Sequence, residues 1–238
     1  MSALRIAVWT GSFLVGAWSA CGAATQPPPQ EVRANDVYRA IVRSAEIRSP
    51  SDTLGNGLYA AAKRAFYSGN VDEAVARAQE FSKSYSRNLN LNDALEMVLL
   101  ARGYRDFQDE PLRAYARVRA LREGGQPDSA SAVAAAALGR WPGARIRYHL
   151  HYQLAELARD RGDHALAITH AMAVADTSAK SRLAPAALKL AGDETIATGQ
   201  GRTGALKLYQ ELLERFPQSP LAPAVRSQVM ELRKEMQL

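Results

Sequence analysis

Six residues near the carboxyl end have the glycine spacing of a dinucleotide-binding loop, G-x-G-x-x-G. They are Gly199-Gln200-Gly201-Arg202-Thr203-Gly204. In such a loop, bare backbone amides hold a pyrophosphate, but the loop must follow a β-strand and open the helix of a βαβ unit. The preceding residues 186–198 have a helical pattern instead. We therefore interpret these glycines as a turn between helices and predict no nucleotide cofactor.

The four histidines could bind a metal only if their rings converged. His149 and His151 point about 200° apart around a helix, and His164 and His170 diverge similarly. No His-x-x-x-His pair of the kind that binds zinc occurs in the chain. We interpret the histidines as surface or groove residues and predict no metal site.

Nucleophilic chemistry has little support in the sequence. The single cysteine, Cys21, lies in the amino-terminal leader, so the folded domain has no thiol nucleophile and no disulfide. Neither G-x-S-x-G nor H-E-x-x-H occurs. The acidic pairs Asp109 with Glu110 and Glu211 with Glu214 are typical of solvated helix faces. We predict no catalytic residue and no cofactor.

Composition favours an all-α protein. The 238 residues include 44 alanines but only 13 valines, 6 isoleucines and 8 threonines, so helix formers outnumber β-branched residues. A hydrophobic content of 47% with one cysteine excludes a disordered chain and a disulfide scaffold. The net charge of +6 is small for this length, and no nucleic-acid partner is expected.

The first twenty residues have the pattern of an export signal. Arg5 supplies a positive start, and the apolar residues 6–18 are shorter than the roughly 20 that a spanning helix needs. The tail Trp18-Ser19-Ala20-Cys21 resembles the lipobox of bacterial lipoproteins, although that family usually has an aliphatic residue where Trp18 stands. The resemblance implies cleavage after residue 20 and a diacylglycerol on the Cys21 thiol. Two alternatives are ordinary cleavage after Ala23 or Ala24 and an uncleaved leader that acts as an anchor.

Residues 21–30 follow as the lipidated cysteine and a linker. Three consecutive prolines favour an extended polyproline II spacer. Gly22 stands where some bacterial lipoproteins carry an aspartate that retains them in the inner membrane. By resemblance we expect a lipid-anchored protein of the outer membrane that faces the periplasm. The alternative is a soluble periplasmic or secreted protein.

Residues 31–238 show a repeat. Segments 130–142 and 205–217 match at an offset of 75 residues, which is two periods of about 37 to 38. Independently, the sequence Leu-Ala-Pro-Ala occurs at 183–186 and again at 221–224, an offset of 38. Two unrelated landmarks therefore give one period.

Residues 152–168 resemble a tetratricopeptide repeat (TPR). In that family an apolar residue and a small residue precede a Gly-Asp turn, and an alanine follows five residues after the glycine; Leu154, Ala155, Gly162 and Ala167 match. Gly162 can adopt a left-handed helix C-cap, and the small alanines let two helices approach closely. The other residues that fit the pattern are Gly69, Ala74, Ala130, Ala205 (five after Gln200) and the helix-ending Pro217.

The resemblance implies a TPR-like α-solenoid of antiparallel helical hairpins. The helices are expected at 31–47, 52–68, 71–86, 91–105, 109–123, 127–140, 145–161, 163–175, 181–198, 202–215 and 220–236. Helix 91–105 has no partner in the repeat register, so the phase between 88 and 124 stays open.

In TPR arrays the first helix of each hairpin lines a concave groove. Transfer of those positions to this chain predicts a partner-binding groove that contains Tyr115, Arg119, Arg122, His149, Tyr152, Glu156 and Arg159. Aromatic rings with arginine forks suit an extended peptide or its carboxylates. The alternative is a solvated, arginine-rich surface, since the chain between Asp128 and Glu156 carries arginines but no acidic residue.

The favoured function is an outer-membrane-tethered scaffold that binds another envelope protein and performs no chemistry, similar to the helical-repeat lipoproteins of envelope assembly. One alternative is a secreted module that binds peptidoglycan or another glycan. A second is a hydrolase whose residues converge only in the fold, for example in a cleft that gathers His149 or His170 with carboxylates.

Overall fold

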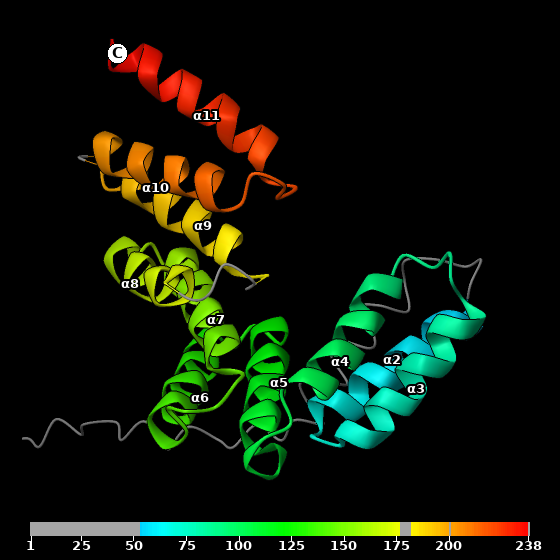
Figure 1. Ribbon diagram of the computed structural model, residues 1–238. Coiled ribbons are helices and arrows are strands. Elements are labelled where there is room, and N and C mark those ends of the chain that lie inside the picture. Colours follow the sequence, from blue (N-terminus) through cyan, green and yellow to red (C-terminus); the bar gives the residue numbers. More distant parts are fainter. Residues whose placement is uncertain (1–52, 177–181, 200, 238) are drawn as a thin grey trace, which may run out of the picture. The chain divides into compact units, whose positions relative to one another are not determined.

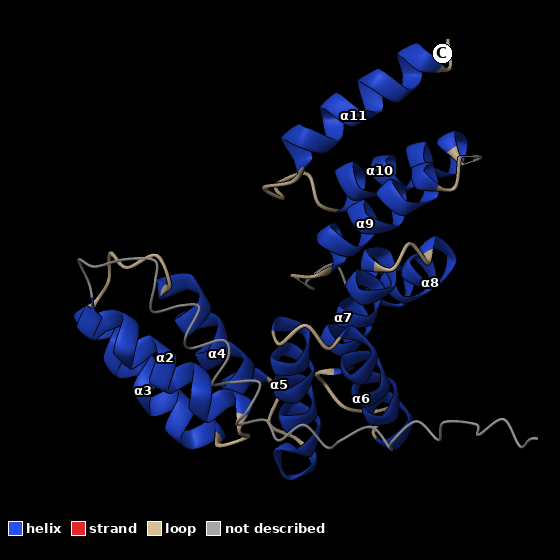
Figure 2. Ribbon diagram, turned by 180° about the vertical axis from the view of Figure 1, so that it is seen from behind, coloured by secondary structure: helices blue, strands red, loops and turns tan. Residues whose placement is uncertain are grey.

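Helices make up all the regular structure in the described part of the chain. The computed structural model describes residues 53–176, 182–199 and 201–237 and shows no strand within these ranges (Figures 1 and 2). The all-α prediction is confirmed. Within the same ranges, no helix has both the length and the apolar character needed to cross a bilayer. The predicted signal peptide 1–20, Cys21 with the linker to residue 30, and the predicted helix 31–47 lie outside the described residues.

The described helices correspond one to one with those expected from residue 52 onward. They are α2 (Thr53–Tyr67), α3 (Val71–Ser84), α4 (Leu91–Gly103), α5 (Glu110–Glu123), α6 (Pro127–Arg140), α7 (Arg147–Asp160), α8 (His164–Ala175), α9 (Ala184–Ala197), α10 (Arg202–Arg215) and α11 (Ala222–Glu235). The expected starts of α9 and α11 were too early. Both helices instead begin at an alanine that is followed by a proline, a residue that favours the first helical turn because it has no N–H to leave unbonded.

A left-handed glycine ends the first helix of four hairpins. Gly69, Gly125, Gly162 and Gly199 have φ between +71° and +81°, and the last three are spaced 37 residues apart. In the α7–α8 turn, the amide of Gly162 donates to Arg159 O and the amide of Asp163 donates to Ala158 O, both at 2.9 Å. This pair of bonds is a Schellman motif, which a glycine at this position allows without strain.

Small residues let the second helix of each hairpin pack closely. Ala74, Ala130 and Ala167 each lie five residues after a turn glycine, and all three are buried. Ala205 is also buried, but the prediction that its turn centres on Gln200 is wrong. The left-handed residue is Gly199. The interval between this glycine and the start of α10 is one residue longer than the interval between the turn glycine and the second helix in the other hairpins.

Consecutive helices pack on one another in a solenoid-like order. Contacts run from α2 through α3 to α4, and again from α5 through each successive helix to α11. The helix outside the repeat register, α4, packs on α3 and α2, while α5 packs on α2 and α7. This arrangement brings α4, α5 and α7 around one pocket. The exposed residues of α11 include Arg226, Glu231, Arg233, Lys234 and Glu235.

A left-handed turn connects α4 to α5. Three consecutive non-glycine residues, Phe107, Gln108 and Asp109, have φ of 46°, 58° and 66°. Asp109 is 9% exposed and accepts two hydrogen bonds from the fork of Arg105, at 3.1 Å from Nε and 2.6 Å from Nη2. Arg105 also donates to Asp72 of α3 at 2.7 Å. The prediction that Asp109 is solvated is therefore wrong, because this arginine compensates for its burial.

Candidate functional site

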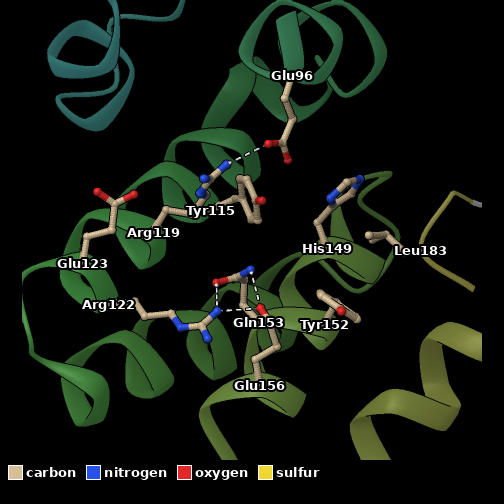
Figure 3. Close-up of a pocket in the computed structure, with 10 residues that line it drawn as sticks. All are labelled: Glu96, Tyr115, Arg119, Arg122, Glu123, His149, Tyr152, Gln153, Glu156 and Leu183. Atoms are coloured by element: carbon tan, nitrogen blue, oxygen red, sulfur yellow. Dashed lines mark hydrogen bonds and ion pairs between the residues drawn. The ribbon is translucent and has the colours of Figure 1, made fainter. Parts of the chain in front are cut away.

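A pocket of about 430 Å³ lies among α4, α5, α7 and the residue that precedes α9 (Figure 3). Helix α5 supplies four of its residues and α7 supplies four more. The full lining is Glu96, Tyr115, Arg119, Arg122, Glu123, His149, Tyr152, Gln153, Glu156 and Leu183.

The pocket contains six of the seven residues that the sequence predicted for a groove. The exception is Arg159, which does not line it and instead pairs with its neighbour Asp160 at 3.1 Å. Glu96, Glu123, Gln153 and Leu183 were not among the predicted residues. Glu96 comes from α4, which the repeat register did not place, whereas Glu123 and Gln153 could have been found because each directly follows a predicted residue on the same helix.

Helical periodicity explains how the side chains converge. The α7 residues occur at spacings of three, one and three, which keeps them on one face of the helix. The α5 residues from Tyr115 to Glu123 follow a similar spacing and face them from the neighbouring helix. Figure 3 shows the two sets on either side of the hollow, with Glu96 above them.

Both arginines of the pocket are already paired within the chain. Arg119 contacts Glu96 at 3.3 Å. Arg122 contacts Glu156 at 2.5 Å and Asp160 at 3.1 Å, and it also donates to the amide oxygen of Gln153 at 3.3 Å. A carboxylate ligand must therefore compete with carboxylates of the protein itself. The guanidinium groups position the walls of the pocket rather than stand open to an anion.

Glu123 is held by a neighbouring hairpin. Its carboxylate contacts Lys63 of α2 at 2.5 Å and accepts a hydrogen bond from the hydroxyl of Tyr67. Burial and this carboxylate raise the pKa of Tyr67, so the phenol stays protonated and continues to donate. These polar contacts link the pocket to α2. They also occupy the oxygens of the Glu123 carboxylate.

Aromatic rings at His149 give the pocket an uncharged side. The imidazole lies edge-on to Tyr104 and Tyr115, with ring centroids 4.8 and 5.6 Å away. Burial, helped by the positive charge of Arg119, lowers the pKa of His149 to about 4. Burial likewise raises the pKa of Tyr115 to about 12. Both rings are therefore neutral near pH 7.

The chemistry of the lining bears on the hydrolase alternative. The pocket does gather His149 with three carboxylates, the feature that would favour the hydrolase alternative. However, a histidine that titrates near pH 4 is a weak base at neutral pH, and the lining offers no serine, threonine or cysteine as a nucleophile. Within the described ranges, no group of three or more His, Cys, Asp or Glu side chains converges as a metal site would require.

The G-x-G-x-x-G segment lies between two helices, as the sequence analysis concluded. It follows α9, and Gly204 already belongs to α10. A β-carbon on Gly201 would come within 2.4 Å of Thr195 Cγ2 and 2.5 Å of Thr195 O, so this glycine permits close packing of the turn against α9. The segment lacks the strand that a dinucleotide site requires.

Comparison with known proteins adds no identity to these observations. No family model matches the chain, and no curated protein matches its sequence.

Proposed function

We propose that this chain is a TPR-like scaffold lipoprotein of the bacterial cell envelope, which holds a segment of another envelope protein in the pocket of α4, α5 and α7. The proposal assigns no chemistry to the protein. Its lipid would be attached at Cys21 and would tether it to the outer membrane, with the helical domain in the periplasm.

One observation carries the binding proposal: residues chosen only from their positions in a TPR-like register line one pocket. Six side chains from two separate helices converge there, including Tyr115, His149 and Tyr152. Aromatic surface beside fixed polar groups is typical of sites that bind a segment of another protein. The pairing of both arginines within the chain indicates what charge the bound segment should have. A neutral or weakly charged peptide segment fits this lining better than an acidic one.

Photocrosslinking in cells tests the pocket directly. A photoreactive residue at Tyr152 is expected to capture a defined partner, because this side chain lines the pocket. The matched control is the same residue at Met230 of α11, which is 66% exposed and does not line the pocket. Capture of the same partner with equal yield from both positions, or from neither, would contradict the proposal.

Charge reversal gives a second test of the same pocket. Arg119→Glu combined with Arg122→Glu is expected to abolish partner capture, because it places acidic groups against Glu96 and Glu156 and disrupts the walls. The matched control, Arg226→Glu with Arg233→Glu, reverses two exposed charges on α11. Helical circular dichroism must show that both variants fold. Retained capture by the pocket variant would exclude this pocket, and binding of the purified protein to isolated sacculi would favour the glycan alternative.

The lipid anchor has its own test. Cells that produce the full chain are labelled with radioactive palmitate, and the protein is expected to incorporate the label unless Cys21 is replaced by serine. The Cys21→Ser variant is also expected to leave the membrane fraction. Labelling that persists in this variant, or no labelling of the wild-type chain, would contradict lipidation at Cys21.

A further inference from the structure

Two histidines face each other across the α7–α8 hairpin, outside the pocket described above. The Nδ1 atoms of His151 in α7 and His170 in α8 are 3.1 Å apart. Their ring centroids are 5.3 Å apart, and the ring planes are inclined by 41°. Both side chains are half-buried, and neither lines the pocket. The pair was not predicted, because its two histidines belong to different helices.

Two imidazole nitrogens at this distance are held by a hydrogen bond or by a cation between them. In a neutral imidazole one nitrogen carries a proton and the other offers a lone pair. The contact therefore contains either one shared Nδ1 proton or, when both rings carry their proton on Nε2, two lone pairs directed at one space. Burial lowers the pKa of both histidines, and the neighbouring ring and Arg147 add to this for His151. The neutral imidazole is the form that binds metals.

The separation of the two nitrogens fits a chelated metal ion. Zinc–imidazole bonds are about 2.0–2.1 Å long, so two adjacent ligands of a tetrahedral or octahedral ion lie roughly 2.9–3.4 Å apart. The observed 3.1 Å falls inside this interval. Imidazole suits zinc, copper and nickel in preference to magnesium or calcium. We propose that His151 and His170 form a bidentate site for a divalent ion of this class, with water in the remaining coordination positions.

The surroundings set how strongly such a site can bind. No third His, Cys, Asp or Glu joins the pair within the described ranges, so this part of the chain supplies two ligands. Arg147 opposes the bound cation, although its guanidinium is turned toward Ala144 O at 3.4 Å and the hydroxyl of Tyr148. Removal of this charge by Arg147→Gln is therefore expected to strengthen metal binding.

Zinc titration of the full chain in detergent micelles tests the site. Calorimetry is expected to give one ion per chain at this pair, and ¹⁵N spectra of the histidine side chains should show both Nδ1 resonances shifting together. His151→Gln and His170→Gln are each expected to weaken binding roughly tenfold or more, because the second bond of a chelate forms intramolecularly.

The matched control is His164→Gln on the same hairpin, since His164 faces Glu194 instead of another histidine. This variant is expected to bind zinc at the pair as the wild type does. Absence of binding, equal affinity in all three variants, or a shift of only one ring would overturn the proposal. The ¹⁵N measurement on the unmodified chain decides the question even if a variant fails to fold.

Discussion

The ring of Tyr209 in α10 lies directly against the backbone of Gly192 in α9. A β-carbon on this glycine would come within 2.3 Å of Tyr209 Cε1 and 2.8 Å of Cδ1. The ring is fully buried, and its hydroxyl donates to Asp193 Oδ1 at 2.6 Å. The buried position of the Tyr209 ring and the hydrogen bond of its hydroxyl therefore both depend on the absence of a side chain at residue 192.

The equivalent positions in the other hairpins carry a larger residue in the first helix and a smaller residue in the second helix than Gly192 and Tyr209. Seven residues before their turn glycines, the other first helices carry Ala62, Val118 and Ala155. Tyr209 lies four residues after the buried Ala205, and four residues after the corresponding alanines the other second helices carry Ala78, Ala134 and Ala171. All six are fully buried. The last hairpin has exchanged this pairing for a glycine and a tyrosine, so the two substitutions depend on each other.

Gly192→Ala is expected to destabilise the protein by about 1–3 kcal/mol, because the new methyl group overlaps the buried ring. Urea unfolding measures the change. The matched control is Gly139→Ala in α6, where a β-carbon would meet nothing within 4 Å. There, alanine should be neutral or should stabilise the helix by up to about 1 kcal/mol. Equal effects of the two substitutions would show that Tyr209 does not constrain residue 192.

Ala205→Leu is expected to cost roughly 1–3 kcal/mol, because Ala205 is fully buried in the α9–α10 hairpin and a larger side chain forces the helices apart. The melting temperature of the variant reports the loss. Ala135→Leu in α6 is the control, since Ala135 is exposed and leucine is also a good helix former. If both variants melted like the wild type, the close approach of α9 and α10 would be wrong.

Acid is expected to weaken the fold through His149. Its pKa lies near 4 in the folded chain and near 6.5 when unfolded, so below pH 6.5 the unfolded chain binds a proton that the folded chain does not. The free energy of unfolding should therefore fall between pH 6.5 and 4, by on the order of 1–3 kcal/mol from this residue. His149→Phe keeps an aromatic ring and should remove that part of the pH dependence.

Proton NMR of the His149 ring checks this expectation without a variant. A titration midpoint near pH 4 is expected. A midpoint near 6.5 would mean that the ring is solvated and that the uncharged side of the pocket is open to water.

Local patterns predicted much of the fold. The spacing from Gly162 to Ala167 anticipated a hairpin because both residues act within one turn and the helix beside it. The turn before α10 was misplaced because one additional residue separates Gly199 from that helix, and spacing alone could not reveal it. Asp109 was misjudged for a different reason: its partner Arg105 reaches it only when the chain adopts a left-handed turn.

The site residues that follow the expected repeat register could be predicted, and the others could not. Tyr115 and Tyr152 follow from the register of α5 and α7, whereas Glu96 depends on how α4 packs outside that register. The pairing of His151 with His170 likewise depends on the rotation of two helices about their own axes. Periodicity within one helix carries no information about that rotation relative to a neighbour.

The left-handed turn between α4 and α5 offers a substitution that should stabilise the protein. Gln108 is exposed and has φ of 58° and ψ of 33°, a conformation that costs a non-glycine residue roughly 1–2 kcal/mol. Glycine adopts it without steric cost but gains entropy when unfolded, which offsets part of the benefit. We therefore expect Gln108→Gly to raise the free energy of unfolding by about 0.5–1 kcal/mol. Gln79→Gly in the middle of α3 should lower it by about 1 kcal/mol. Urea unfolding of both variants decides the matter, since losses of similar size would mean that the backbone at residue 108 is not left-handed.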